Sequence, residues 1–330
     1  MSRPRVLFIG VGSIGERHLR CFGQTDRADV AICEMNESLR VEIADRYRVE
    51  HAFAEFDEAI VDPPDAAVIC TPAHLHIPMA IRLAEAGVHL LIEKPLSIGL
   101  DGVTDLTRVV SKNDVIAAVA YTSRMNPLLS EMRREIRDER FGRPVQLTAI
   151  GGQHFPFYRP AYREIYYNDR KTGGGAIQDA LTHTVNSAEW IIGPMTNVAA
   201  DAAHHILEGV EVEDTVHVIA RHEEVQASYS LNQHQAPNES TMTVVCERGT
   251  ARIEMHKHRW RWTTKPDEPW HDETREPIER DSMFVSQANM FLDAIEKDAP
   301  VACSLEEGLQ TLRANLAILR AADTLTWQEV

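Results

Sequence analysis

A carboxylate and an imidazole four residues apart follow a run of three glycines near the middle of the chain. Asp179 and His183 lie in the segment GGGAIQDALTH, residues 173–183, and apolar residues from Ala176 to Ile192 recur with a helical period. Positions i and i+4 of a helix project from the same face, so we expect the two side chains to form a pair. The glycines would let a ligand or a second stretch of backbone approach the first N–H groups of that helix.

The spacing of this pair leaves two interpretations open. An Asp and a His on a mostly buried helix can form a purely structural hydrogen bond. Beside a substrate, the same pair can hold and move a proton, because the ordinary pKa of His is about 6.5. An independent second motif is needed to choose between them.

The start of the chain carries such a motif, G-x-G-x-x-G. Gly10, Gly12 and Gly15 follow the apolar run Arg5–Ile9 and precede a helix-like stretch, Glu16–Phe22. A second strand is expected at Ala28–Cys33, and the next residue, Glu34, lies 19 positions after Gly15. This context predicts a dinucleotide site in which Glu34 meets the adenosine ribose. The residues expected at the pyrophosphate are Gly10, Gly12, Ser13, Ile14 and Gly15.

Strands and helices alternate through the first third of the chain, which predicts a doubly wound parallel sheet. Further strands are expected at Val49–Phe53, Ala66–Cys70, Val88–Ile92 and Val115–Ala120, with helices at Ser38–Tyr47, His76–Ala86 and Asp101–Ser111. Ligands of such sheets lie beyond the carboxyl ends of the strands. We therefore expect two segments to border the cofactor, one with Thr71, Pro72 and His76 and one with Glu93 and Lys94.

Taken together, GVGSIGERH, CTPAHLH, EKPLS, Asn126-Pro127 and GGGAIQDALTH resemble the Gfo/Idh/MocA family of NAD(P)-dependent sugar and cyclitol dehydrogenases. The order and spacing of the motifs hold over essentially the whole chain. The resemblance implies that Lys94, Asp179 and His183 form the catalytic group and that Thr71, Pro72 and His76 lie beside the cofactor. One departure is Ala73, where many members carry Asn.

The chemistry of these residue types agrees with an alcohol oxidation. His183 would accept the hydroxyl proton of a sugar, sugar derivative or cyclitol, while a hydride leaves for the nicotinamide. Lys94 would stabilise the developing alkoxide, and Asp179 would orient the imidazole or bind a neighbouring hydroxyl. We expect NAD as the cofactor. NADP stays open, because Arg40 could reach a 2′-phosphate.

A basic stretch before the glycines bears on the substrate. Arg159, Arg163 and Lys171 lie in an expected loop and could bind a carboxylate, sulfonate or phosphate. The alternative is that they pair with acidic neighbours such as Glu164 and Asp169. Two further candidate substrate residues, Arg124 and Asn126, follow the expected domain boundary.

That boundary is expected near Tyr121, with a Rossmann domain at residues 1–121 and an α+β domain at residues 122–330. Alternating strands at Thr215–Arg221, Val225–Leu231, Thr241–Cys246 and Ala251–Met255 predict a mostly antiparallel sheet in the second domain, followed by helices at Phe284–Lys297 and Leu305–Leu325. We expect the active site between the domains. The family resemblance implies a homodimer or homotetramer that associates through the open face of this sheet.

Composition excludes several other classes. The chain has 34 basic and 50 acidic residues and a net charge of −16, which argues against nucleic-acid binding. We find no signal peptide and no apolar run of membrane-spanning length, and five cysteines without a C-x-x-C pair fit a cytoplasmic protein. His256 and His258 could share one strand face and a metal, but no carboxylate or cysteine supports them, so no metal is expected.

Two other functions remain as alternatives. A redox-neutral glycoside hydrolase or lyase would oxidise its substrate transiently and regenerate NAD. A dinucleotide-sensing regulatory protein would bind the cofactor without turnover. The joint presence of Lys94, Asp179 and His183 favours the dehydrogenase, because a sensor needs no proton-transfer group.

Overall fold

The computed structural model describes residues 3–164 and 166–330, which form two compact units. The first unit comprises the chain up to Met125 together with Glu279–Gly308. The second comprises Asn126–Ile278 and Leu309–Val330. The division at Met125 lies close to the boundary expected near Tyr121. The second range, however, is not continuous as expected, because residues 279–308 belong to the first unit.

Within the described residues, six strands form the parallel sheet of the first unit, in the order β3-β2-β1-β4-β5-β6. The strands are β1 (Arg5–Ile9), β2 (Asp29–Cys33), β3 (His51–Phe53), β4 (Ala66–Ile69), β5 (His89–Ile92) and β6 (Ala117–Val119). The order reverses between β1 and β4, and all neighbouring pairs are parallel. This is the doubly wound sheet that the alternation predicts.

Helices connect these strands. They are α1 (Ser13–Gln24), α2 (Glu37–Tyr47), α3 (Phe56–Ala59), α4 (His76–Glu85) and α5 (Val103–Lys112), with short 3-10 turns η1 (Ala73–Leu75) and η2 (Thr122–Met125). The apolar face of α1 packs on the sheet, where Phe22 meets Phe8 edge-on with ring centroids 5.3 Å apart. Burial of this face orients α1 so that its first residue directly follows the glycine-rich loop.

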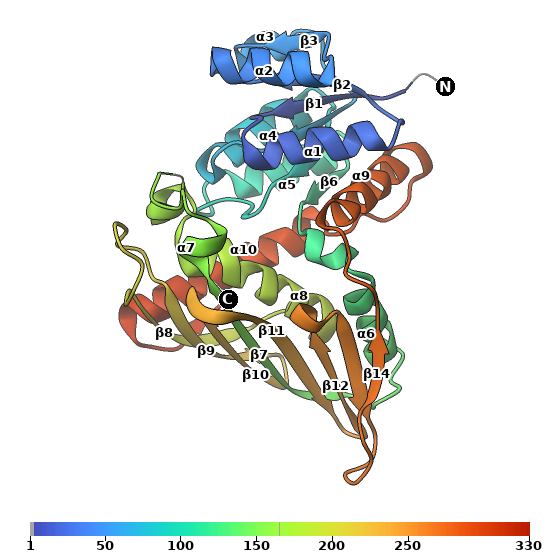
Figure 1. Cartoon of the computed structure of the whole chain (residues 1–330). Coiled ribbons are helices and arrows are strands. Elements are labelled where there is room, and N and C mark those ends of the chain that lie inside the picture. The colour runs from blue at the N-terminus through green and yellow to red at the C-terminus, as the bar shows by residue number, and fades with distance from the viewer. Residues whose placement is uncertain (1–2, 165) are drawn as a thin grey trace. The chain divides into compact units, whose positions relative to one another are not determined.

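A helix from late in the chain completes the core of the first unit. Helix α9 (Arg280–Lys297) lies beside α1 (Figure 1), and Ala288, Phe291 and Leu292 join the same apolar cluster as Phe22. Its apolar residues are buried against α1, which explains why this segment leaves the second domain to which the sequence assigned it.

The second unit is built on a mixed sheet that includes nine strands of the described ranges, in the order β14-β13-β12-β11-β7-β10-β9-β8-β15. Neighbours pair antiparallel except β7 and β10. The strands are β7 (Pro144–His154), β8 (Asn197–Ala203), β9 (Thr215–His222), β10 (Val225–Asn232), β11 (His234–Cys246), β12 (Gly249–Glu254), β13 (Arg259–Thr263), β14 (His271–Thr274) and β15 (Gln328–Glu329). The expected alternation is confirmed, whereas the long central strand β7 was not anticipated.

Helices cover one face of this sheet. Helix α6 (Pro127–Arg137), helix α8 (Thr182–Ile192) and the later part of α10 (Leu305–Thr324) bury apolar residues against it (Figure 1). One-turn elements occur at α7 (Phe155–Tyr158), η3 (Tyr166–Asn168), η4 (Arg170–Thr172) and η6 (Met255–Lys257), and a π-helical turn, η5 (Ile177–Leu181), leads into α8. Among the described residues of this unit, no helix that packs on the sheet lies on its other face (Figure 1).

Candidate active site

Gly10 and Gly15 of the first loop are required for different steric reasons. Gly10 has a φ of +80°, a left-handed conformation that side chains disfavour, and its N–H donates to the carbonyl of Cys33 at 2.9 Å. A Cβ on Gly15 would lie 1.9 Å from the carbonyl oxygen of Gly10. Helix α1 can therefore start this close to β1 only with glycine at position 15, as the motif predicts.

The first turn of α1 is open to a ligand. A Cβ added at Gly12 would meet no atom within 4 Å, and no side chain caps the helix there. Ser13 is exposed and Ile14 half-buried at the start of the helix. The first N–H groups of a helix have no partner within it, and the helix dipole favours an anion at this end. The loop thus fits the pyrophosphate of a dinucleotide.

Glu34 lies against this loop at the end of β2. Its Oε2 accepts the N–H of Val11 at 3.0 Å, and its Oε1 accepts the N–H of Asn36 at 2.9 Å. An ionised carboxylate has about four acceptor sites, so acceptor capacity remains for ribose hydroxyls. Arg40, which the sequence left as a possible phosphate ligand, donates to the backbone carbonyl of Glu34 at 2.7 Å.

Lys94 and Glu93 follow β5, as expected, but Glu93 does not point to open space. Its Oε1 lies 2.7 Å from Nε2 of His18, and its Oε2 accepts the backbone N–H of Lys94 at 3.0 Å. Burial raises the pKa of Glu93, but His18 and the charge of Lys94 outweigh burial and leave the pKa below its ordinary value. Both carboxylate oxygens of Glu93 are bound within the protein, and contact of this side chain with the cofactor stays a prediction. Lys94 itself is half-buried.

His76 likewise binds protein atoms. Its Nε2 lies 2.8 Å from the carbonyl oxygen of Thr71, and its Nδ1 lies 3.1 Å from that of Pro95. Burial lowers the pKa of this imidazole. His76 therefore joins the segment after β4 to the segment after β5, and its place beside the cofactor stays a prediction. Pro72 is exposed beside it.

Asp179 and His183 lie one helical turn apart, as predicted. Asp179 belongs to the π-helical turn η5, His183 belongs to α8, and both are half-buried. Tyr166 donates its hydroxyl to Oδ1 of Asp179 at 2.6 Å. Local π geometry is frequent at functional sites.

The glycines before this helix serve the protein's own packing. Glu213 is buried, and its Oε1 and backbone carbonyl accept the N–H groups of Ile177 and Ala176, each at 3.0 Å. A Cβ on Gly175 would lie 2.5 Å from the Glu213 carboxylate, and one on Gly174 would lie 2.3 Å from a Tyr167 carbonyl. A second stretch of backbone approaches, as the sequence allowed. A ligand at these N–H groups is excluded, because Glu213 already binds them.

The candidate substrate residues have different environments. Arg163 donates to the backbone carbonyl of Glu208 at 2.6 Å and pairs with its carboxylate at 3.3 Å. Arg163 thus forms an ion pair of the kind that the alternative describes, with the exposed Glu208 as its acidic partner. Arg159 and Lys171 are exposed.

Arg124 and Asn126 have structural contacts near the end of the first unit. Arg124 is buried, pairs with Glu307 at 2.6 Å and donates to the carbonyl of Ala302 at 3.0 Å. Asn126 begins α6, where its side-chain oxygen accepts the N–H groups of Leu128 and Leu129. An Asn before a Pro at the first helical position is a regular helix start.

No group of three or more His, Cys, Asp or Glu side chains suited to a metal occurs in the part of the chain that the structure describes. The expected shared strand face of His256 and His258 is wrong. His256 lies in the turn η6, and His258 has a φ of +49° after that turn. Among the described helices, none is long and apolar enough to cross a membrane.

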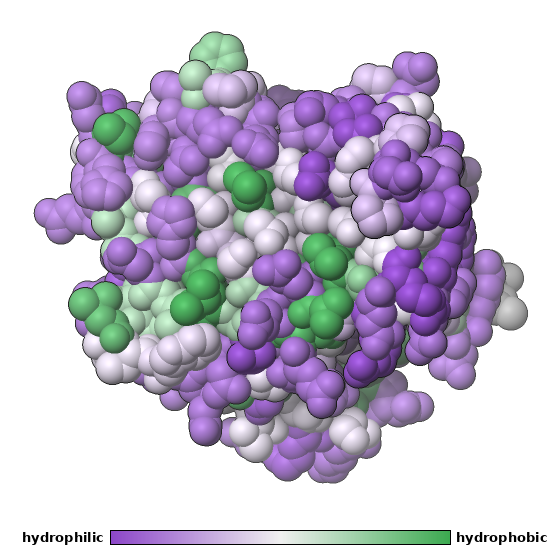
Figure 2. All heavy atoms as spheres, turned by 90° about the horizontal axis from the view of Figure 1, so that it is seen from below, coloured by the Kyte–Doolittle hydropathy of each residue, from purple (hydrophilic) through white to green (hydrophobic). Residues whose placement is uncertain are grey.

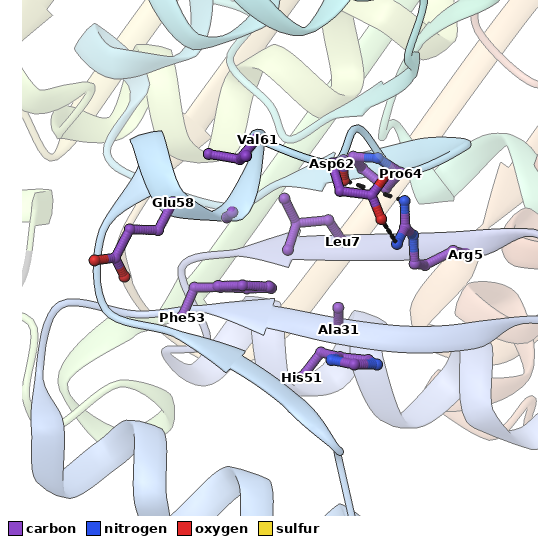
Figure 3. Close-up of a pocket in the computed structure, with 10 residues that line it drawn as sticks. Arg5, Leu7, Ala31, His51, Phe53, Glu58, Val61, Asp62 and Pro64 are labelled. Carbon is purple, nitrogen blue, oxygen red and sulfur yellow. Dashed lines mark hydrogen bonds and ion pairs between the residues drawn. The ribbon is translucent and has the colours of Figure 1, made fainter.

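A cavity of about 180 Å³ lies in the first unit (Figure 3). Leu7, Ala31 and Phe53 line it from three neighbouring strands. At its edge, Arg5 pairs with Asp62 at 2.6 Å. None of the expected cofactor residues lines this cavity.

Three residues that contact the candidate residues or their segments were not singled out from the sequence: His18 in the first unit, and Tyr166 and Glu213 in the second. His18 is the last residue of the GVGSIGERH segment and lies three positions after Gly15, the one available signal. Tyr166 and Glu213 reach the Asp179 helix from separate segments, and no local pattern marks them. Lys94 and the glycine loop belong to the first unit, whereas Asp179 and His183 belong to the second.

Comparison with known proteins gives concordant results. Inositol 2-dehydrogenase of Rhizobium meliloti is 27% identical in an alignment of 331 positions that covers 95% of each chain. Levoglucosan dehydrogenase of Pseudarthrobacter phenanthrenivorans is 29% identical in an alignment of 211 positions that covers 61% of this chain and 54% of that protein. The match thus spans about half the length of that second relative.

Two solved structures share the fold over the full chain. Levoglucosan dehydrogenase in complex with NADH and levoglucosan has a TM-score of 0.91 at 22% identity and covers 100% of both chains. The WlbA dehydrogenase of Bordetella pertussis in complex with NADH and UDP-GlcNAcA has a TM-score of 0.85 at 23% identity, covering 100% of this chain and 99% of that one.

Two family models match successive parts of the chain. Residues 4–121 match the oxidoreductase family with an NAD-binding Rossmann fold, and residues 129–252 match the GFO/IDH/MocA C-terminal domain. The glycine loop, Glu34 and Lys94 lie in the first match, and Asp179 and His183 lie in the second. The chain therefore belongs to the Gfo/Idh/MocA family of oxidoreductases, with an NAD-binding Rossmann domain in its first part.

Proposed function

We propose that this chain is an NAD-dependent dehydrogenase that oxidises a secondary hydroxyl of a sugar, a sugar derivative or a cyclitol. The observation that supports this proposal is that the chain has both a cofactor site and proton-transfer groups. The cofactor site is the open N-terminus of α1 beside Glu34. The proton-transfer groups are Lys94 after β5 and the pair of Asp179 and His183, one helical turn apart. The full-length similarity to an inositol 2-dehydrogenase supports the same substrate class.

In this proposal, His183 and Lys94 act on the same hydroxyl oxygen of the substrate. Nε2 or Nδ1 of His183 accepts the hydroxyl proton, and the Lys94 ammonium donates a hydrogen bond to the developing alkoxide. Asp179, held by the Tyr166 hydroxyl, orients the imidazole or a neighbouring hydroxyl of the substrate. Bound NAD supplies the nicotinamide ring that takes the hydride from the carbon.

A neutral carbohydrate is the better substrate candidate. The anionic alternative depended on Arg159, Arg163 and Lys171, and the guanidinium of Arg163 is bound to Glu208. Arg159 and Lys171 are left as the anion ligands to test.

The test is a screen in which NAD or NADP is incubated with levoglucosan, myo-inositol, sugar acids and nucleotide sugars. The absorbance of NADH or NADPH measures the reduction of the cofactor. We expect turnover of at least one neutral compound, and we expect Lys94→Ala to lower kcat for it by about 10² to 10⁴. Formation of product in excess of the NAD supplied, without accumulation of NADH, would establish the redox-neutral hydrolase or lyase instead. NAD binding without turnover of any compound would favour the sensor.

We also propose that the chain forms a homodimer or homotetramer through the open face of its large sheet. This face carries short or uncharged side chains in register across three strands, among them Thr148, Ile150, Ser228, Ser230 and Ile219. Hydrophobic residues there stand among polar ones (Figure 2), and Ile150 and Ile219 are 40% and 54% exposed. Such a flat face can pack on a second copy of itself.

Light scattering after gel filtration tests this assembly. Ile219→Asp should shift the protein to a smaller species, because it would place a charge in the interface. Ile206→Asp, at an exposed residue outside the sheet, should not. An equal mass for wild type and Ile219→Asp would contradict the proposal. A cytoplasmic location stays a prediction, which cell fractionation tests.

A further inference from the structure

Two buried titratable groups in the first unit have no part in the proposed proton transfer. His18 on α1 is 1% exposed, and Glu93 after β5 is 5% exposed. Nε2 of His18 lies 2.7 Å from Oε1 of Glu93, and the other carboxylate oxygen of Glu93 accepts the N–H of Lys94 at 3.0 Å. A continuous chain of hydrogen bonds therefore runs from α1 to the backbone of Lys94.

We propose that His18 is a positioning residue for Lys94 and acts through the Glu93 carboxylate. This inference rests on the proposed function only in giving Lys94 a catalytic role. The physical reason is that a buried carboxylate is costly unless it is paired and hydrogen-bonded. With His18 in place, Glu93 stays charged and keeps one oxygen on the Lys94 amide. Without it, the carboxylate would protonate or turn toward water and release that amide.

The second imidazole of the region holds the next residue of the same turn. His76 contacts the carbonyl of Pro95 at 3.1 Å, while its other nitrogen faces Thr71. The backbone on each side of the Lys94 side chain is thus tied to a different helix, α1 through Glu93 and α4 through His76. A lysine side chain is long and flexible, so the direction in which it leaves the backbone depends on these ties.

A packing role for His18 is the competing explanation. Its ring also meets Phe284 of α9 edge-on, with centroids 5.1 Å apart. Phe284 is buried and contacts His18 from another element without any hydrogen bond to Glu93. Phe284→Leu is therefore a matched control, because it loosens the packing of His18 and leaves the chain of hydrogen bonds in place.

The experiment compares four proteins: wild type, His18→Leu, His18→Gln and Phe284→Leu. Gln carries an N–H donor near the position of Nε2, whereas Leu fills space without a donor. We expect His18→Leu to lower kcat at least about tenfold, since a small misplacement of a reacting group is costly. KM and NADH affinity should stay within about threefold. His18→Gln should recover most of kcat, and Phe284→Leu should retain it.

A second measurement needs no substrate. Hydrogen–deuterium exchange isolates the Lys94 amide when overlapping peptides that differ at this position are compared, and Pro95 adds no signal because it has no N–H. We expect faster exchange in His18→Leu, and exchange near that of wild type in His18→Gln and Phe284→Leu. If wild type oxidises no carbohydrate, the proposed function fails, and this measurement still decides the present inference.

Three results would overturn the inference. One is unchanged exchange at Lys94 in His18→Leu. Another is an equal loss of kcat in His18→Leu and Phe284→Leu, which would show that His18 acts by packing. The third is a His18→Gln variant that folds, binds NADH and is as impaired as His18→Leu. If His18→Leu does not fold, exchange at Lys94 in His18→Gln and in Glu93→Ala supplies the comparison, with faster exchange expected only in Glu93→Ala.

Discussion

The carboxylate of Glu34 accepts the backbone N–H of Val11 at 3.0 Å, between the first two glycines of the loop. The same side chain accepts the N–H of Asn36 with its other oxygen. Glu34, which follows β2, thus holds the glycine-rich loop in place and also has free acceptor sites for the hydroxyls of a ribose. Its substitution should affect the shape of the loop and the choice of cofactor together.

We expect NAD to be preferred over NADP, and Glu34→Ser to narrow the preference. A 2′-phosphate near the carboxylate would be repelled by about 1 kcal/mol in water and about 4 kcal/mol at intermediate dielectric, which is a preference of roughly fivefold to a thousandfold. Values of kcat/KM for both cofactors measure this ratio. Because the loop loses its brace, affinity for NAD should also fall in Glu34→Ser. A wild type that prefers NADP would contradict the assignment of Glu34.

Lys94→Ala and His183→Ala should each lower kcat by about 10² to 10⁴, since each removes one partner of the same proton transfer. NAD affinity should change little. The losses should be less than additive in the double variant, because both groups act on one oxygen. Steady-state kinetics and NADH fluorescence measure the two quantities. Near wild-type turnover in either single variant would refute its role.

Tyr166→Phe and Tyr167→Phe form a matched pair. Tyr166 donates to Asp179 at 2.6 Å, whereas the adjacent Tyr167 donates to Gln233 at 2.5 Å inside the unit. Loss of the charge-assisted bond to Asp179 should lower kcat by about tenfold. Loss of the Tyr167 hydroxyl should lower the melting temperature and leave kcat nearly unchanged. The reverse pattern would show that Asp179 needs no help from Tyr166.

Arg163→Ala should have little effect on KM for either charged or neutral substrates, because this guanidinium is bound to Glu208. Arg159→Ala and Lys171→Ala test the remaining anion ligands under the same assay. A tenfold rise in KM confined to anionic substrates in Arg163→Ala would restore the acidic-sugar hypothesis.

Stability should fall in mildly acid solution because of His222. Burial lowers its pKa to about 4, while its nitrogens contact the Gly193 carbonyl and the Tyr229 hydroxyl. The unfolded chain has a His pKa near 6.5, so below that value it binds a proton that the folded chain does not. Between pH of about 6.5 and about 4, this costs up to roughly 3 kcal/mol.

Thermal denaturation of wild type and His222→Gln over that range measures the effect. The stability advantage of the wild type should shrink as the pH falls, because only the wild type carries this titrating imidazole. Parallel curves for the two proteins would show that His222 does not titrate as described.

The sequence alone determined the parallel sheet, the roles of Gly10 and Gly15 and the helical spacing of Asp179 and His183. These features are encoded in short windows: apolar periodicity, a glycine that only a tight turn requires, and a fixed rise per residue. The sequence also predicted that Glu34 lies beside the glycine-rich loop, because the loop, helix α1 and strand β2 follow one another in a single unit.

The contacts between residues far apart in the sequence depend on how whole helices and strands pack. Helix α9 returns to the first unit because its apolar face packs on α1, although more than 100 residues separate it from the division at Met125. His18 meets Glu93, Glu213 meets the start of the Asp179 helix, and Glu208 meets Arg163 in the same way. Each of these pairs joins two segments that are far apart in the sequence. The segments come together because whole helices and strands bury their apolar faces, so a local residue pattern cannot identify the partner.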